Sequence, residues 1–204
     1  MKPYKKNNRF KPTFTLNSIS KSGDDKELPL ASCAWQLFNA YNSESKNIYW
    51  TSCDFLRMYL LNKQDNKNIY IINLIEEKYE EYDYSNNIKY FHIPITDDFM
   101  SGTTITENFE KIMEAYKFWE DSDDADLIIH CKMGIHRSFS VAALLSMFIF
   151  NINNDIPYDN PTSDDFYNYV NMIQLKNKYI FEPAYLTNEN IIYMYDIFTK
   201  YKNA

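Results

Sequence analysis

Short apolar segments alternate with longer segments of helical spacing along most of the chain. The strand-like segments, which are β-branched or alternate between apolar and polar residues, are residues 48–50, 69–74, 89–95 and 127–129. The segments with helical spacing are residues 30–41, 51–62, 104–118, 138–151, 163–176 and 187–202. Because strands alternate with helices, the pattern predicts an α/β fold with a central, mostly parallel β-sheet flanked by helices on both faces.

Two of these helices carry signals for where they begin and which side they bury. Thr51 or Ser52 is expected to cap the helix that runs to about Asn62. Its predicted apolar contacts are Phe55, Met58, Tyr59 and Leu61. Thr104 and Glu107 match a capping box at the start of the next helix. The apolar stripe of that helix, which we expect to pack in the core, is Phe109, Ile112, Met113, Tyr116 and Phe118.

The length and composition fit one globular domain. The chain has 204 residues, of which 45% are hydrophobic and 24% are charged, a balance typical of folded chains. Residues 29–204 are predicted to form a single domain, and residues 1–28, which are polar and irregular, a flexible N-terminal segment. The basic residues of that segment are interpreted as a solvated tail in preference to a docking arm.

The acidic charge limits the partners that we expect. A net charge of -7 and a pI near 5.0 argue against nucleic-acid and anionic-membrane partners, which require a basic face. The N-terminal sequence does not resemble a signal peptide, and the longest apolar run, residues 142–150, is too short to cross a bilayer. We therefore expect a soluble protein of the cytoplasm or nucleus, and the sequence sets no oligomeric state.

The cysteines indicate a reducing compartment. Cys33, Cys53 and Cys131 are odd in number and lack the regular spacing of a disulfide scaffold. Only Cys131 has a histidine beside it, and no pair of ligands recurs at zinc spacing, which argues against a metal site. No metal or other cofactor is predicted.

The most informative segment is a short loop with the sequence His-Cys-Lys-Met-Gly-Ile-His-Arg-Ser. It runs from His130 to Ser138, between a predicted strand that ends at Ile129 and a helix that begins at Ser138. A strand that ends and a helix that begins so close together direct successive backbone N–H groups at one point before the positive helix end. This loop is therefore a predicted anion site, and a phosphate fits it.

Three residues of the loop suit phosphate chemistry. Cys131 lies at its base, where unpaired N–H groups and the helix dipole favour thiolate over thiol, so it is the predicted nucleophile. Arg137 can fork two N–H bonds onto phosphate oxygens, which a lysine cannot do. Gly134 lets the backbone turn tightly beside the anion. The predicted phosphate-binding residues are Lys132, Met133, Gly134, Ile135, His136 and Arg137. The alternative is a buried structural cysteine beside an ordinary helix start.

The loop resembles the signature of the cysteine-based protein tyrosine phosphatase superfamily, and most closely that of its dual-specificity branch. Its Lys-Met-Gly and Arg-Ser sequences are similar to the Slingshot-type version of the loop. The resemblance extends from about Ile48 to Leu186, and residues 71–74 resemble the strand ahead of the family's catalytic half. Residues 90–97 resemble the segment that carries the family's general acid. In that alignment Asp97 is the acid, and its neighbour Asp98 is the alternative.

The resemblance implies a two-step phosphoryl transfer without a metal. Cys131 attacks phosphorus while Asp97 protonates the leaving oxygen, and water then hydrolyses the cysteinyl-phosphate with Asp97 as base. Ser138 would donate a hydrogen bond to the departing sulfur, and His130 would order the loop from beneath. Lys132 and His136 either contact the substrate or face solvent.

Three functions fit this pattern. The first is a protein phosphatase for phosphotyrosine and phosphoserine or phosphothreonine. The chain shows no equivalent of the tyrosine-bearing loop that deepens the pocket of classical tyrosine phosphatases, which implies a shallow pocket that admits all three. The second is a phosphatase for a phosphoinositide or an RNA 5′-triphosphate, which Ile135 and His136 disfavour because the lipid- and RNA-specific loops carry Lys and Asn there. The third is a phosphate-binding module with little turnover, which the presence of both Cys131 and Arg137 disfavours.

Overall fold

The computed structural model describes residues 36–63, 66–77, 87–97, 102–153, 162–177 and 188–202. Its strands are β1 (Phe38–Asn42), β2 (Lys46–Ser52), β3 (Asn68–Asn73), β4 (Ile88–His92) and β5 (Ala125–Cys131). Its helices are α1 (Cys53–Asn62), α2 (Gly102–Glu120), α3 (Arg137–Asn153), α4 (Ser163–Asn177) and α5 (Asn188–Lys202). The N-terminal segment predicted over residues 1–28 lies outside the described residues, so that division of the chain stays a prediction.

The strands form one sheet in the order β1-β2-β5-β3-β4. β2, β5, β3 and β4 run parallel, and β1 pairs with β2 in the antiparallel direction. Every residue of β5, the middle strand, is buried, as expected for a parallel strand that is covered on both faces. The predicted fold class is therefore confirmed.

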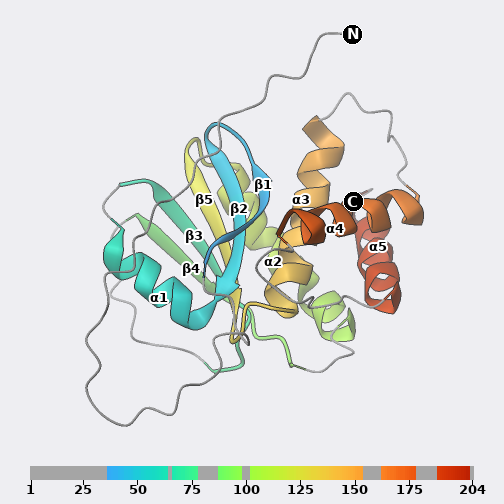
Figure 1. Ribbon diagram of the computed structural model, residues 1–204, viewed down its shortest axis with the longest axis horizontal. Coiled ribbons are helices and arrows are strands. Elements are labelled where there is room, and N and C mark those ends of the chain that lie inside the picture. Colours follow the sequence, from blue (N-terminus) through green and yellow to red (C-terminus); the bar gives the residue numbers. More distant parts are fainter. Residues whose placement is uncertain are drawn as a thin grey trace. The chain divides into compact units, whose positions relative to one another are not determined.

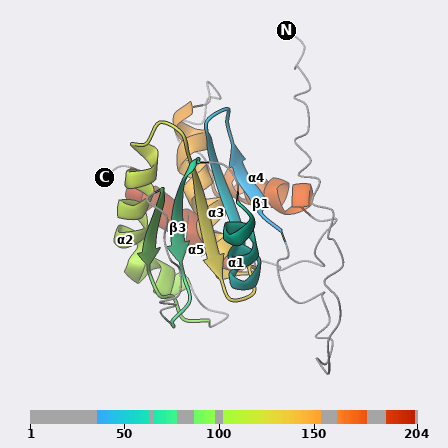
Figure 2. The same ribbon diagram turned by 90° about the vertical axis from the view of Figure 1, so that its left-hand side faces the viewer.

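The helices cover the two faces of the sheet unequally. α1 lies over one face, and the other helices lie on the opposite side, where α2 and α3 contact the strands directly (Figures 1 and 2). On β5 this division follows the alternation of side chains: Ile128 packs with Leu56 of α1, and Ile129 joins the larger core on the other face. Every side chain of α3 from Phe139 to Ile149 is buried. None of the described helices is long and apolar enough to cross a membrane.

Two expectations for the first part of the chain have different outcomes. The helix expected over residues 30–41 is wrong in its described part, because residues 38–42 form β1. Burial there alternates with period two, and Phe38 stacks on Trp50 of β2 with ring centroids 5.2 Å apart. The cap of α1 is confirmed, since Ser52 Oγ accepts a hydrogen bond from Phe55 N at 3.2 Å.

Some of the expected apolar contacts are also wrong. Met58 and Leu61 are 47% and 85% exposed, because the short helix α1 turns Leu56 toward the sheet instead. Phe118 of α2 is 48% exposed, whereas its neighbour Trp119 is buried. α2 begins at Gly102, two residues before Thr104, so the predicted capping box does not mark the helix start.

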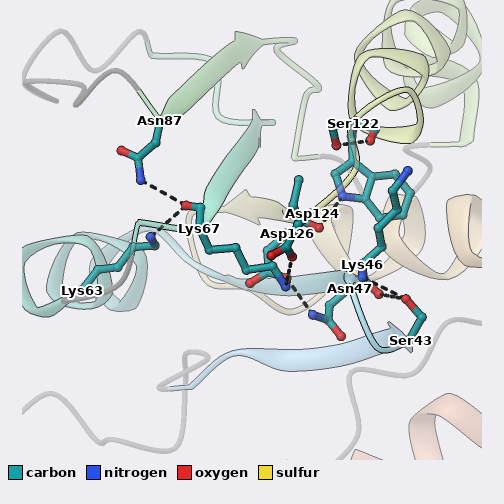
Figure 3. A network of polar contacts seen from close by, with 11 residues as sticks. Ser43, Lys46, Asn47, Lys63, Lys67, Asn87, Ser122, Asp124 and Asp126 are labelled. Atoms are coloured by element: carbon teal, nitrogen blue, oxygen red, sulfur yellow. Dashed lines mark hydrogen bonds and ion pairs between the residues drawn. The ribbon is translucent and has the colours of Figure 1, made fainter.

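The amino-terminal edge of the sheet is held by a partly buried ion pair (Figure 3). Lys67 Nζ lies 2.8 Å from Asp126 Oδ1 and 3.3 Å from Asp124 Oδ1. Asn47 Nδ2 donates a second hydrogen bond to Asp126 Oδ1 at 2.7 Å. Burial lowers the pKa of Lys67, but the hydrogen bonds and charges of Asp126 and then Asp124 raise it by more. This pair therefore joins the segment before β3 to β5.

At the other end of β5, His130 is fully buried one residue before Cys131. Burial lowers the pKa of His130 to about 3; a backbone contact with Cys131 opposes this effect, and nearby His92 and Arg137 reinforce it. Neither ring nitrogen of His130 has a hydrogen-bond partner among the described residues, so the contact with the Cys131 backbone is not a hydrogen bond of normal geometry. The imidazole is therefore neutral in the fold at neutral pH.

We expect Lys67→Met to destabilise the fold because it leaves the buried Asp126 carboxylate with Asn47 as its remaining hydrogen-bond partner among the described residues. The free energy of unfolding should fall by about 1–2 kcal/mol, less than for a fully buried pair because Lys67 is partly exposed. Urea unfolding followed by circular dichroism measures this change. Asp124→Asn is the control, since the Asp124 side chain is 67% exposed and should change stability little. Equal effects of the two substitutions would contradict a stabilising role of the contact between Lys67 and Asp126.

Buried His130 should make the fold sensitive to acid. An unfolded histidine binds a proton near pH 6.5, and folded His130 binds one only near pH 3, so the unfolded chain holds more protons between these values. The free energy of unfolding should therefore fall by about 2 kcal/mol from pH 7 to pH 5 on account of this residue.

Urea titrations at each pH test this expectation. In His130→Leu the drop should shrink by that amount, and in His136→Gln, which changes a half-buried histidine of the following loop, it should persist. An unchanged pH dependence in His130→Leu would show that His130 is not the group responsible.

Candidate active site

The carboxyl ends of the parallel strands meet at one edge of the sheet, where α/β proteins commonly bind ligands. Backbone hydrogen bonds hold the segments that leave these strands side by side. Leu74 N donates to His130 O at 2.9 Å, and Ile95 N donates to Leu74 O at 3.2 Å. The segments after β3 and β4 are thereby fixed next to Cys131, the last residue of β5.

The sulfur of Cys131 lies inside the loop that joins β5 to α3. Gly134, at the middle of this loop, has a φ of 71°, which a residue with a Cβ atom disfavours. Its backbone N–H donates to Cys131 Sγ at 3.2 Å, and Ser138 Oγ lies 3.3 Å from the same sulfur. Two hydrogen-bond partners and the amino end of α3 thus converge on the sulfur, and all three favour negative charge there.

Arg137, the first residue of α3, is fixed beside the sulfur-bearing loop by two backbone carbonyls. Its side chain is 4% exposed, and Nη1 donates to Ile95 O at 2.8 Å and to Leu74 O at 3.3 Å. Nη2 forms an ion pair with Asp97 Oδ2 at 3.1 Å. Nε is buried without a hydrogen-bond partner among the described residues. The Nε–Nη2 edge, which can fork onto two oxygens, is therefore the edge without a backbone partner.

The turn that supplies one of these carbonyls is itself held by side chains. Asn73 Oδ1 accepts a hydrogen bond from Ile75 N at 2.8 Å, and Asn73 Nδ2 donates to the hydroxyl of Tyr90. His92 Nε2 lies 2.8 Å from Ile75 O. Both ends of the Ile75 residue are thus fixed, and with them the neighbouring Leu74 carbonyl that anchors Arg137.

Sequence reasoning missed this support. Leu74 and Ile95 contribute through their backbone oxygens. Every residue type has such an oxygen, so no pattern of side chains reveals this role. Asn73 was the available signal, because a fully buried amide that ends a β-branched strand requires hydrogen-bond partners.

The structure brings most of the predicted site residues together. Lys132 is exposed, and Met133, Ile135 and His136 are half-buried in the loop between Cys131 and Arg137. Cys53 N donates to Lys132 O at 3.3 Å, which ties the start of the loop to α1. Asp97 lies at the outer side of Arg137 with its side chain 55% exposed, and Asp98 lies outside the described residues. Within the described part of the chain, no cluster of His, Cys, Asp or Glu could hold a metal ion.

This arrangement suits a reaction at a tetrahedral anion. The Cys131 sulfur, the Nε–Nη2 edge of Arg137 and the Asp97 carboxyl group lie around the loop that joins β5 to α3. The anion would be held by the loop and by Arg137, with the sulfur below it and the partly exposed Asp97 near the solvent side. No redox group is needed for such a reaction.

Three solved structures share the fold at low sequence identity. The OH1 protein of the Orf virus, a tyrosine phosphatase that displays triple substrate specificity, matches with a TM-score of 0.57 and 16% identity over 86% of this chain and 91% of its own. The Yvh1 phosphatase domain of Chaetomium thermophilum matches with a TM-score of 0.54 and 13% identity over 81% and 96%. DUSP15 matches with a TM-score of 0.51 and 15% identity over 76% and 88%.

Comparisons of sequence give no such match. No protein-family model and no curated protein sequence matches the chain significantly. The likeness is therefore one of structure, and it agrees with the resemblance of the loop from Cys131 to Arg137. The chain therefore has the α/β fold that these tyrosine and dual-specificity phosphatases share.

Proposed function

We propose that the protein is a dual-specificity protein phosphatase that hydrolyses phosphotyrosine and phosphoserine or phosphothreonine in protein substrates. The single observation that carries the proposal is the hydrogen bonding of the Arg137 guanidinium. Its Nη1 is engaged by the carbonyls of Leu74 and Ile95, while its buried Nε has no partner among the described residues. An unpaired buried donor is costly, and an oxygen of a bound phosphate would satisfy it.

In the first step, Cys131 Sγ attacks phosphorus and the bond from phosphorus to the ester oxygen breaks. The hydrogen bonds from Gly134 N and Ser138 support the thiolate before the attack, and the loop N–H groups and Arg137 stabilise the equatorial oxygens during it. Asp97 gives its proton to the leaving oxygen, so the product is a neutral alcohol or phenol. The phosphoryl group remains on the sulfur.

In the second step, a water attacks the phosphorus of the cysteinyl-phosphate and the sulfur–phosphorus bond breaks. Asp97, now a carboxylate, takes a proton from the water, and orthophosphate is the product. Ser138 donates a hydrogen bond to the departing thiolate, since its hydroxyl is 3.3 Å from the sulfur. Each residue therefore returns to its starting state after one turnover.

Two features support a broad range of phosphorylated side chains. The sequence has no counterpart of the tyrosine-bearing loop that deepens the pocket of classical tyrosine phosphatases, so the short phosphoserine side chain could reach Cys131. The loop also has exposed Lys132 and half-buried His136 beside the phosphate position, where they could meet the acidic surroundings of a phosphopeptide. OH1 of the Orf virus, which shares the fold, is a tyrosine phosphatase that displays triple substrate specificity.

We expect Cys131→Ser to abolish hydrolysis of 4-nitrophenyl phosphate. The rate should fall on the order of 1,000-fold or more, because a serine hydroxyl without a general base is a poor nucleophile. Cys53→Ser is the matched control, since Cys53 is the other buried cysteine of the described residues and the substitution keeps its backbone N–H, which donates to Lys132 O. Its rate should stay within about twofold of wild type.

Other outcomes decide between the proposals. A wild-type rate in Cys131→Ser would remove this cysteine from the mechanism. Binding of inorganic phosphate by calorimetry without turnover of any phosphomonoester would identify a binding module instead. Retention of a phosphorylated protein by Cys131→Ser, but not by Cys131→Ser combined with Arg137→Ala, would identify the substrate class.

We expect Asp97→Asn to lower the turnover of phenyl phosphate by about 100-fold, the usual scale of general acid catalysis. An amide cannot donate the proton, so the basic limb of the pH–rate profile should also disappear. Steady-state rates across a pH series measure both effects. Asp98→Asn is the neighbouring control and should retain the wild-type profile; the reverse result would assign the acid to Asp98.

A further inference from the structure

Asp97 lies on the segment after β4, and the proposed substrate phosphate would compete for its contact with Arg137. Among the described residues its carboxylate has one ion-pair partner, Arg137 Nη2 at 3.1 Å, and the Asp97 side chain is 55% exposed. The proposed substrate phosphate needs the same Nε–Nη2 edge of Arg137. Binding of the phosphate would therefore weaken the contact that now holds Asp97.

A second anchor lies one residue earlier in the chain. Thr96 Oγ1 is 2.9 Å from Thr104 Oγ1, the hydroxyl of the third residue of α2, and either oxygen can be the donor. This contact joins the segment after β4 to the first turn of the helix, across residues 98–101. It involves neither Arg137 nor the loop of Cys131, so a bound phosphate would leave it intact.

The position of Thr104 supports a role beyond helix formation. Threonine is a poor helix former, and its capping role is excluded because α2 begins two residues earlier, at Gly102. Its backbone carbonyl accepts from Asn108 Nδ2 at 3.0 Å, which fixes the first turns of α2. The Thr104 hydroxyl is thus presented to Thr96 by a rigid element.

We propose that Thr104, acting through Thr96, is a positioning residue that keeps Asp97 in place when substrate occupies Arg137. The proposal rests on the proposed function, in which Asp97 is the general acid. The buried Ile95 carbonyl is fixed on Arg137 at 2.8 Å, so the Thr96–Thr104 contact completes the fixation of the backbone that leads into Asp97. Loss of the contact should therefore affect proton donation and leave the nucleophile and the phosphate loop unchanged.

Leaving groups of different basicity separate these effects. A 4-nitrophenolate departs readily without a proton, whereas a phenolate is a much stronger base and departs slowly unless an acid protonates it. The parameter kcat/KM reports the first chemical step, in which this protonation takes place. A defect in the position of Asp97 should thus appear with phenyl phosphate and be nearly absent with 4-nitrophenyl phosphate.

The test compares wild type, Thr104→Val and Thr96→Val on these two substrates. Each substitution removes one hydroxyl with little change of shape, and kcat/KM for phenyl phosphate should fall roughly 3- to 10-fold, the usual effect of one hydrogen bond. For 4-nitrophenyl phosphate it should change less than about twofold. The double variant should be no worse than either single variant, because both remove the same contact. Thr104→Ser, which keeps the hydroxyl, should restore the wild-type ratio.

Thr199→Val is the matched control, since Thr199 on α5 donates to Asp196 O at 3.0 Å and lies outside the site. It should leave both rates unchanged. Equal losses on the two substrates, or no loss on either, would overturn the proposal for Thr104. Asp97→Asn run in parallel separates the two claims: if it discriminates between the substrates and the threonine variants do not, only the positioning role fails. If Asp97→Asn does not discriminate, the assignment of the acid fails as well.

Discussion

The contact of one guanidinium nitrogen with two backbone carbonyls is the constraint on which the site depends. Nη1 of Arg137 joins α3 to the segments after β3 and β4 through Leu74 O and Ile95 O. A planar guanidinium fixed at one nitrogen has little freedom left, so the direction of its remaining edge is set as well. The loop, the arginine and the segment with Asp97 thus take their relative positions from one buried cation.

The surrounding charge explains why such local fixation is needed. The chain carries a net charge of -7, so its overall field repels a phosphate instead of attracting it. Attraction must come from short-range donors: the N–H groups of the loop, the amino end of α3 and Arg137. These act over a few ångströms and only when they are correctly oriented, so the rigidity of the site substitutes for a broad positive surface.

The sequence could predict the parts of the fold that depend on local patterns. The β-branched run of β3 and the spacing from Cys131 to Arg137 are local, and they led to the parallel sheet and to the loop. β1 could not be predicted, because the apolar residues near Phe38 fit a helix as well as a strand, and pairing with β2 decides between them. Likewise, the carbonyls of Leu74 and Ile95 leave no trace in residue types. The exposure of Leu61 follows from how α1 sits on the sheet, which its own sequence does not determine.

The central strand β5 carries the ion pair of Asp126 with Lys67 near one end and the sulfur of Cys131 at the other. Three buried apolar residues, Leu127 to Ile129, separate the two ends. Substitutions near Asp126 can therefore raise or lower the free energy of unfolding while the geometry around Cys131 stays unchanged. A substitution near Asp126 that stabilises the fold can thus offset the stability lost through a substitution near Cys131 that changes the range of substrates.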